Sequence, residues 1–275
     1  MTVTMPERFR MLHQAGTFVL PNPWDIGSAR ILESLGAVAL ATTSAGHAAS
    51  KGRLDQNVSM DEVLAHAEEL IGAIDIPLNL DSERCFAETP EGVLANARRL
   101  AETGAAGFSI EDYDPVTGGI DPIERAVERV AAAVEGAAST GAMVTARTEN
   151  HLYGVDDLDD TVARLQAFVG AGAAVVYAPG LVDLAAIARV VDEIDAPVNV
   201  LAFGRGPTVA ELASVGVRRV STGSGLARAA HGALVSAATE LLEVGTFSFL
   251  SGSSTDGSFA AVPISRSRLD AAFGH

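Results

Sequence analysis

LAETGAAGFSIED, residues 100–112, decides the fold because it joins the end of a helix to a short buried strand through one glycine. Three other stretches have the same construction: LESLGAVALATT at 32–43, FVGAGAAVVYAP at 168–179 and LASVGVRRVSTG at 212–223. Glycine is favoured directly after a helix, where the backbone turns left-handed. The short apolar run that follows is typical of a strand covered on both faces. The repetition therefore predicts a chain built from helix–strand units.

The number of these units predicts a barrel. About eight strands are expected, at residues 17–20, 38–42, 77–81, 107–111, 143–147, 175–178, 198–202 and 218–221. Stretches with helical periodicity separate them, and Ser59 with Glu62 forms a capping box before one of them. Strands that alternate with helices pair in parallel, so an α/β fold of the (β/α)8 TIM-type barrel is predicted. A doubly wound open sheet is the alternative, but no Gly-x-Gly-x-x-Gly follows the first strand.

Composition excludes several classes of partner. The chain has 275 residues, of which 48% are hydrophobic, and a formal net charge of −16. Nucleic acid and anionic membranes are poor partners because both require a basic surface. One cysteine, Cys85, fits a reducing compartment, and no apolar stretch is long enough for a membrane span or a signal peptide. A soluble cytoplasmic protein is therefore expected.

The chain divides into a barrel and a tail. Residues 1–243 are predicted to form the catalytic barrel domain, and residues 244–275 a C-terminal helical extension. Within the extension, residues 251–258 (SGSSTDGS) have the composition of a linker and an apolar segment follows them. Such a detached segment either packs on a neighbouring subunit or is a frayed tail.

Three predicted strands end on a charged residue, namely Asp81, Glu111 and Arg147. A buried strand has no solvated face for a charge, so these residues need partners or a function. Parallel strands end at one rim of a barrel, where barrel enzymes collect their catalytic residues. Carboxylates suit Mg²⁺, Glu83 adds another acid, and a guanidinium can hold a substrate carboxylate. An ion pair of Arg147 with Glu111 or Glu149 is the structural alternative.

Two long polar loops, 43–58 and 112–121, are expected at the same rim. The first begins with Thr43, Ser44, Ala45 and Gly46, whose small side chains allow backbone N–H groups to approach an anion. Asp55 lies near its end. The length of this loop favours a functional role.

Other reactive side chains contribute less to the prediction. His47 follows the small residues of the first loop and is a candidate substrate contact. Cys85 follows the acidic pair, but no adjacent base indicates a nucleophile. No His-x-x-x-His or Cys/His cluster is present, so zinc is not expected.

From about Leu20 to Leu242 the motifs together resemble the isocitrate lyase/phosphoenolpyruvate mutase superfamily. TTSAG resembles its Ser-Gly-Gly-type oxo-acid loop, GRLD its Gly-x-x-Asp, LNLDSE its Asp-x-Asp metal strand, SIED its metal-linked Glu strand and TARTEN its Ala-Arg-Thr-Asp strand. DYDPVTGGID at 112–121 replaces the lyase signature Lys-Lys/Arg-Cys-Gly-His. The chain is most similar to the branch with Ser-Ala-Gly that is associated with simple 2-oxo acids.

The resemblance implies a bound Mg²⁺, with Mn²⁺ as an alternative. Asp81 would bind the ion, and Glu83 and Glu111 would hold its waters. Substrate binding would fall to Thr43, Ser44, Ala45, Gly46, Asp81 and Arg147. Catalytic roles would fall to Ser44, Asp55 and Arg147.

The resulting hypothesis is a Mg²⁺-dependent carbon–carbon lyase that acts on a small 2-oxo acid, such as oxaloacetate, through an enolate intermediate. One alternative is a phosphonopyruvate or phosphoenolpyruvate C–P bond hydrolase or mutase, with Arg84 or Lys51 replacing a missing loop lysine. Another is a non-catalytic paralogue that binds a 2-oxo acid. The resemblance also implies a homo-oligomer, a dimer or a homotetramer, in which the C-terminal helix is swapped between subunits.

Overall fold

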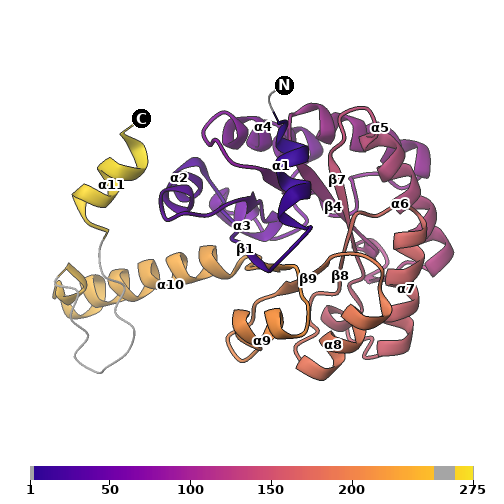
Figure 1. Cartoon of the computed structure of the whole chain (residues 1–275). Coiled ribbons are helices and arrows are strands. Elements are labelled where there is room, and N and C mark those ends of the chain that lie inside the picture. Colours follow the sequence, from indigo (N-terminus) through magenta and orange to yellow (C-terminus); the bar gives the residue numbers. More distant parts are fainter. Residues whose placement is uncertain (1–2, 251–263, 275) are drawn as a thin grey trace.

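The structure is a computed structural model that describes residues 3–250 and 264–274. Eight parallel strands form a nearly closed barrel surrounded by helices (Figure 1). The strands are β1 (Phe18–Leu20), β2 (Leu40–Ala41), β3 (Leu78–Asp81), β4 (Gly107–Glu111), β7 (Met143–Arg147), β8 (Val175–Tyr177), β9 (Val198–Leu201) and β10 (Arg219–Ser221). The (β/α)8 prediction is confirmed, and each strand lies within a range expected from the sequence.

The sheet register brings the charged strand ends together. The strand order is β1-β10-β9-β8-β7-β4-β3-β2, and a backbone hydrogen bond of 3.1 Å from Ala41 N to Pro21 O joins the two outer strands. Asp81 lies opposite Ser109 on β4, and Glu111 lies opposite Arg147 on β7. Three adjacent strands therefore deliver Asp81, Glu111 and Arg147 to one rim.

Helices follow the strands as expected. They are α1 (Met5–Leu12), α2 (Ile26–Ser34), α3 (Ser44–Ser50), α4 (Met60–Ile71), α5 (Pro90–Glu102), α6 (Ile123–Ala137), α7 (Leu158–Gly170), α8 (Leu184–Glu193), α9 (Val209–Ser214), α10 (Gly225–Thr239) and α11 (Arg266–Phe273). The Ser59–Glu62 capping box is confirmed at the start of α4. The repeated glycines have left-handed φ values of 92°, 92°, 98° and 88° at Gly36, Gly104, Gly172 and Gly216, as a residue directly after a helix requires.

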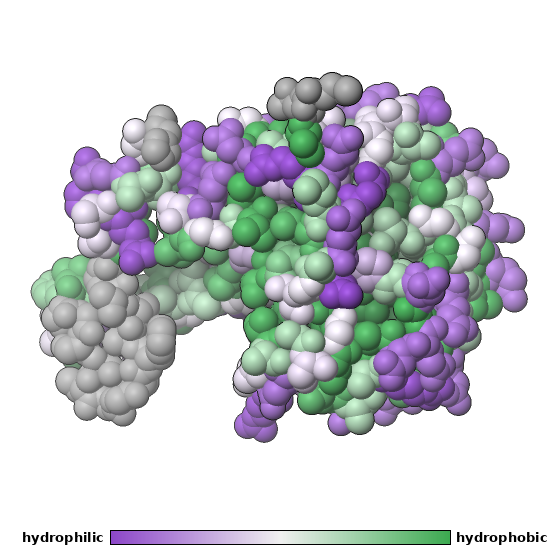
Figure 2. All heavy atoms as spheres, viewed as in Figure 1, coloured by the Kyte–Doolittle hydropathy of each residue, from purple (hydrophilic) through white to green (hydrophobic). Residues whose placement is uncertain are grey.

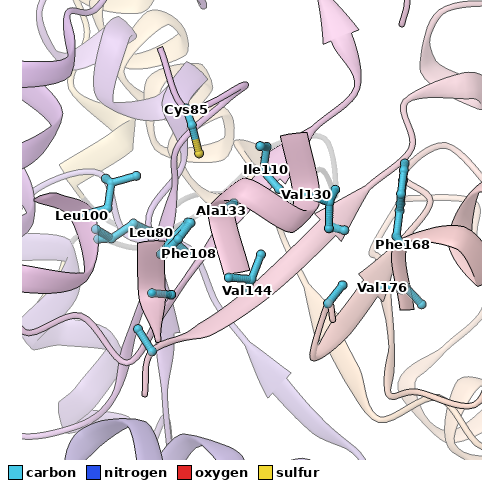
Figure 3. Close-up of a cluster of buried hydrophobic side chains, with 14 of the residues drawn as sticks. Leu80, Cys85, Leu100, Phe108, Ile110, Val130, Ala133, Val144, Phe168 and Val176 are labelled. Atoms are coloured by element: carbon cyan, nitrogen blue, oxygen red, sulfur yellow. The ribbon is translucent and has the colours of Figure 1, made fainter. Parts of the chain in front are cut away.

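Apolar side chains fill the layer between the strands and the helices. Leu80, Phe108, Val144 and Val176 come from neighbouring strands and pack in one buried cluster with helix residues such as Leu100 (Figure 3). Successive strand residues point to opposite faces. The residues between these therefore point into the barrel, which is where a site can form.

Both rim loops contain regular structure that the sequence reading did not anticipate. Within residues 43–58, expected as a polar link, Ser44–Ser50 forms α3, whose first turn is capped by the Thr43 side chain accepting from Gly46 N. The alanine-rich sequence of this segment supports a helix. Residues 112–121 fold into an antiparallel hairpin of β5 (Tyr113–Asp114) and β6 (Gly119–Ile120).

The C-terminal part leaves the barrel. Helix α10 projects away from it, and α11 lies beside α2 (Figure 1). Short helical turns, Glu240–Val244 and Ser248–Leu250, follow α10. The predicted linker at 251–258 lies outside the described residues. The division at residue 243 remains a prediction.

None of the helices in the described part of the chain combines the length and the apolar character that crossing a bilayer requires.

Candidate active site

Asp81, Glu111 and Arg147 converge at the carboxyl-terminal rim of the barrel. Arg147 Nη1 donates to Asp81 Oδ1 over 2.8 Å, and Arg147 Nη2 lies 3.3 Å from Glu111 Oε2. Glu149 Oε1 lies 2.8 Å from both Nε and Nη2 of the same guanidinium. One arginine therefore joins β3, β4 and the loop after β7, and the ion-pair alternative for Arg147 is present in the structure.

The charges in this cluster interact strongly because the side chains are largely buried. Burial by itself would lower the pKa of Arg147, but the carboxylates of Glu149, Glu111 and Asp81 raise it well above its usual value. Burial raises the pKa of Glu111 and Glu149, and Arg147 counteracts this shift. Arg147 therefore remains charged at every relevant pH, and its charge opposes the effect of burial on Glu111 and Glu149 without cancelling it.

A cavity of about 160 Å³ lies beside this cluster. Residues from all eight strands or from the loops after them form its wall. The predicted site residues in this wall are Thr43, Ser44, Ala45, Asp55, Asp81 and Arg147. Gly46, Glu83 and Glu111 lie close to the cavity but are not part of the wall.

The first turn of α3 is hydrogen-bonded to the end of β3. The backbone N–H of Ser44 donates to Asp81 Oδ2 over 2.9 Å, so this N–H, expected to bind an anion, binds a protein carboxylate. Gly46 permits close packing, since a Cβ there would lie 2.5 Å from Thr43 Cγ2 and 3.2 Å from Trp24 Cβ. The small residues of this loop therefore position Asp81 as well as shape the cavity.

Asp55, predicted to lie over the site, is in the cavity wall. Burial and the charge of Asp81 raise the pKa of Asp55, while a hydrogen bond with the Ser44 side chain opposes the shift. The next residue, Gln56, has a left-handed φ of 62°, and its Nε2 donates to Glu111 Oε1 over 3.1 Å. Gln56 thus ties this loop to the acidic cluster, a contact that the sequence reading missed.

The acidic groups fit a Mg²⁺ ion held by few direct protein ligands. Within residues 3–250 and 264–274, no group of three or more His, Cys, Asp or Glu residues could hold a metal ion. Burial and the charges of Asp81 and Asp55 raise the pKa of Glu83 to about 8, so negative charge is crowded here and a cation would relieve it. Asp81 Oδ1 accepts from Arg147 Nη1 and from Ser109 Oγ, whereas Oδ2 accepts from Ser44 N and keeps acceptor capacity for a cation. Mg²⁺ commonly takes one or two carboxylates and retains several waters.

Arg84 and Cys85, which follow Glu83, are not part of the cavity wall. Arg84 lies 2.6 Å from Asp114 Oδ1 and 3.2 Å from Asp121 Oδ2, so it holds the 112–121 hairpin. Cys85 is buried within the apolar cluster (Figure 3), and burial raises the pKa of its thiol to about 12. Cys85 is therefore a packing residue that does not reach the cavity.

His47, the candidate substrate contact, is buried and lies outside the cavity wall. Its ring stacks on His66 with centroids 3.8 Å apart. Burial lowers the pKa of His47, and lowers that of His66 to about 4. The two rings are therefore neutral packing groups that link α3 to α4.

Sequence reading did not single out Tyr177, Asn199 and Arg219, which also line the cavity. They come from β8, β9 and β10, at positions where strand alternation directs a side chain into the barrel. The sequence did contain a signal for Arg219. It is a charged residue within a strand that a barrel buries on both faces, so it needs a partner or a function. The cavity therefore extends from the acidic rim to a second guanidinium.

Comparison with known proteins agrees with this architecture. The family model described as phosphoenolpyruvate phosphomutase matches residues 9–242. An uncharacterized protein of Mycobacterium tuberculosis is 33% identical over 227 residues, which cover 80% of this chain and 85% of that protein. A crystal structure from Burkholderia cenocepacia J2315 has a TM-score of 0.87 and 46% identity, and the match covers 92% of this chain and 93% of that one.

The crystal structure of 2,3-dimethylmalate lyase, a member of the phosphoenolpyruvate mutase/isocitrate lyase superfamily, has a TM-score of 0.83 and 25% identity. That match covers 100% of this chain and 96% of the lyase. The family match extends from α1 to the end of the barrel and its following helix. The chain therefore belongs to the phosphoenolpyruvate phosphomutase family and is an enzyme of the isocitrate lyase/phosphoenolpyruvate mutase superfamily.

Proposed function

We propose that this enzyme is a Mg²⁺-dependent lyase that acts on a small 2-oxo acid and breaks the bond between C3 and C4, which leaves the electron pair on C3 as an enolate conjugated with the 2-oxo group. The observation that carries the proposal is the position of Asp81, which lies in the cavity wall between Ser44 N and Arg147. Members of this superfamily are lyases or mutases that act on such acids. Oxaloacetate is the simplest substrate, because the CO₂ that leaves needs no proton.

Asp81 would bind Mg²⁺ directly, and Glu83 and Glu111 would hold waters of the ion. The bound ion would supply Lewis-acid stabilisation of the negative charge that develops on the 2-oxo oxygen, worth several kcal/mol in such sites. Arg147 orients the Asp81 carboxylate through its 2.8 Å hydrogen bond. Mn²⁺ would serve the same positions.

The loop residues would orient the substrate. The N–H of Ala45 belongs to the first turn of α3 and has no intrahelical acceptor there, so it is available to the carboxylate of a 2-oxo acid. The Ser44 side chain and Asp55 lie in the same part of the wall. Asp55, whose pKa is raised by burial and by Asp81, would hold a proton near the reacting carbon.

The C–P alternative required Arg84 or Lys51 to replace a loop lysine. The structure engages both side chains elsewhere: Arg84 pairs with Asp114 and Asp121, and Lys51 Nζ lies 3.4 Å from Glu62 Oε1. Neither residue is in the cavity wall. These contacts favour the lyase over the hydrolase or mutase.

Turnover of oxaloacetate, phosphonopyruvate and 2-methylisocitrate by the purified protein tests the proposal. With Mg²⁺ we expect pyruvate from oxaloacetate or 2-methylisocitrate, and a fall of about a thousandfold or more in rate when EDTA removes the ion, given the several kcal/mol involved. Phosphate release from phosphonopyruvate would instead identify the C–P enzyme. Binding of pyruvate with no turnover, unchanged by Mg²⁺, would identify a non-catalytic paralogue.

We also propose that the chain forms a homo-oligomer through the arm made by α10 and the turns after it, residues 225–250. The arm leaves the barrel (Figure 1) and, where visible beside the grey atoms, has mostly green and pale shades (Figure 2). Its exposed apolar side chains are Leu234, Val235, Leu241, Leu242, Val244, Phe247 and Leu250. Several exposed apolar side chains on one projecting arm favour an association site, and a dimer or tetramer in the cytoplasm is the proposed form.

Leu242→Asp tests this surface. Leu242 is 82% exposed, so a charge there would leave the fold intact and disrupt packing between arms. We expect light scattering to show the mass falling toward that of the 28.3 kDa monomer. Val116→Asp is the matched control, because Val116 is 83% exposed on the hairpin. A wild-type protein that is already monomeric would refute the proposal.

A further inference from the structure

A second arginine lies inside the barrel, away from the acidic rim. Arg219 is the first residue of β10, is 2% exposed and contributes to the wall of the cavity. Its position in the strand directs its side chain inward, where bulky apolar residues fill most barrels of this type. A full positive charge in this place therefore requires an explanation.

The partners of Arg219 are all uncharged. Its Nε donates to Asn199 Oδ1 over 2.8 Å, its Nη2 donates to Thr145 Oγ1 over 3.1 Å, and its Nη1 lies 3.5 Å from His13 Nε2. His13 is neutral, since burial and the charge of Arg219 lower its pKa to about 3. A guanidinium has five N–H donors, so two remain for another acceptor.

No carboxylate in the described ranges 3–250 and 264–274 forms an ion pair with Arg219. Arg147, by contrast, lies within 3.3 Å of three carboxylates. Burial lowers the pKa of Arg219 to about 9, which still leaves it charged at neutral pH. A buried charge without a counter-ion is costly, and an anion that enters the cavity would offset that cost.

The groups around Arg219 are suited to a carboxylate. Asn199, Thr145 and Ser221 are polar and line the same cavity. The Arg147 guanidinium is 5.3 Å from the centroid of the Tyr177 ring, and the Tyr177 hydroxyl forms a hydrogen bond with Ser221. The cavity thus has a polar and cationic inner end opposite its acidic rim.

We propose that Arg219, with Asn199, Thr145 and Ser221, forms a second anion-binding subsite, which holds the distal carboxylate of the substrate. The enzyme would then select dicarboxylic 2-oxo acids over monocarboxylic ones. This inference rests on the proposed function, because the rim must hold the 2-oxo acid end of the same molecule. Arg147 is paired with three protein carboxylates. It therefore would not supply the positive charge that binds the distal carboxylate.

Two stable acids that differ in one group test the subsite. L-malate carries a carboxylate where (S)-2-hydroxybutyrate carries a methyl group, and calorimetry with Mg²⁺ gives both affinities. We expect the wild type to bind L-malate about tenfold or more tightly, in line with a charge-assisted pair of hydrogen bonds. Arg219→Gln should lose this preference while keeping its affinity for 2-hydroxybutyrate, and Arg219→Lys should keep part of it.

Arg218→Gln is the matched control, because Arg218 precedes Arg219 and its side chain bonds Gly16 O outside the cavity wall. Its preference for L-malate should equal that of the wild type. Equal wild-type affinities for the two acids would overturn the inference even if the Arg219 variants failed to fold. A preference that survives in Arg219→Gln would also overturn it. Failure of the wild type to bind either acid or pyruvate would instead refute the proposed function.

Discussion

Asp81→Asn is expected to reduce Mg²⁺-dependent turnover by about a thousandfold or more, because it removes the charge proposed to hold the ion and with it several kcal/mol of transition-state stabilisation. The amide is also a poor structural substitute. The Asp81 carboxylate accepts from Ser44 N at 2.9 Å and from Arg147 at 2.8 Å on different oxygens. Asparagine has one acceptor oxygen, so its NH₂ group would face a donor.

The measurement is the initial rate of pyruvate formation over a range of Mg²⁺ concentrations. Asp75→Asn is the control, since it removes the same charge from an exposed position just before β3. Circular dichroism of both variants would show whether the barrel remains folded. Stabilisation by a bound metal ion is worth several kcal/mol, which is more than a tenfold change in rate. An Asp81→Asn variant whose activity is within about tenfold of the wild type would therefore contradict the proposed role.

Arg147→Met is expected to abolish activity and to lower the free energy of unfolding by about 3–5 kcal/mol, the usual cost of leaving a buried ion pair without one partner. Asp81, Glu111 and Glu149 all lie within 3.3 Å of this guanidinium. Without it, mutual repulsion among the three carboxylates would push the strand ends apart and open the rim. Arg147→Lys keeps the charge, but an ammonium cannot bond to three carboxylates in the same geometry, so an intermediate loss is expected.

Urea denaturation and turnover assays measure the two effects. Arg189→Met serves as the control, because Arg189 pairs with Asp159 and Glu193 at the exposed surface, and exposed pairs contribute little to stability. Its stability and rate should match those of the wild type. An Arg147→Met variant as stable as this control would show that the rim tolerates its uncompensated charges.

The barrel could be predicted because its signals are local. Gly104 marks the end of a helix, and the apolar run to Ile110 marks a buried strand, whatever the rest of the chain does. The convergence of Asp81, Glu111 and Arg147 follows from parallel pairing alone, because a charge at each strand end must emerge at one rim. Helix α3 was missed because a short, capped helix within a loop gives too little periodicity to detect.

Local signals in the sequence were enough to predict the eight strands and the helices between them, and parallel pairing of those strands was enough to predict the acidic rim. Which side chains meet across the barrel could be learned only from the folded structure. It placed Arg219 beside Asn199 and Thr145, turned Arg84 toward the hairpin instead of the cavity, and buried Cys85. Contacts across a closed barrel depend on strand register and tilt, and no short stretch of sequence encodes either.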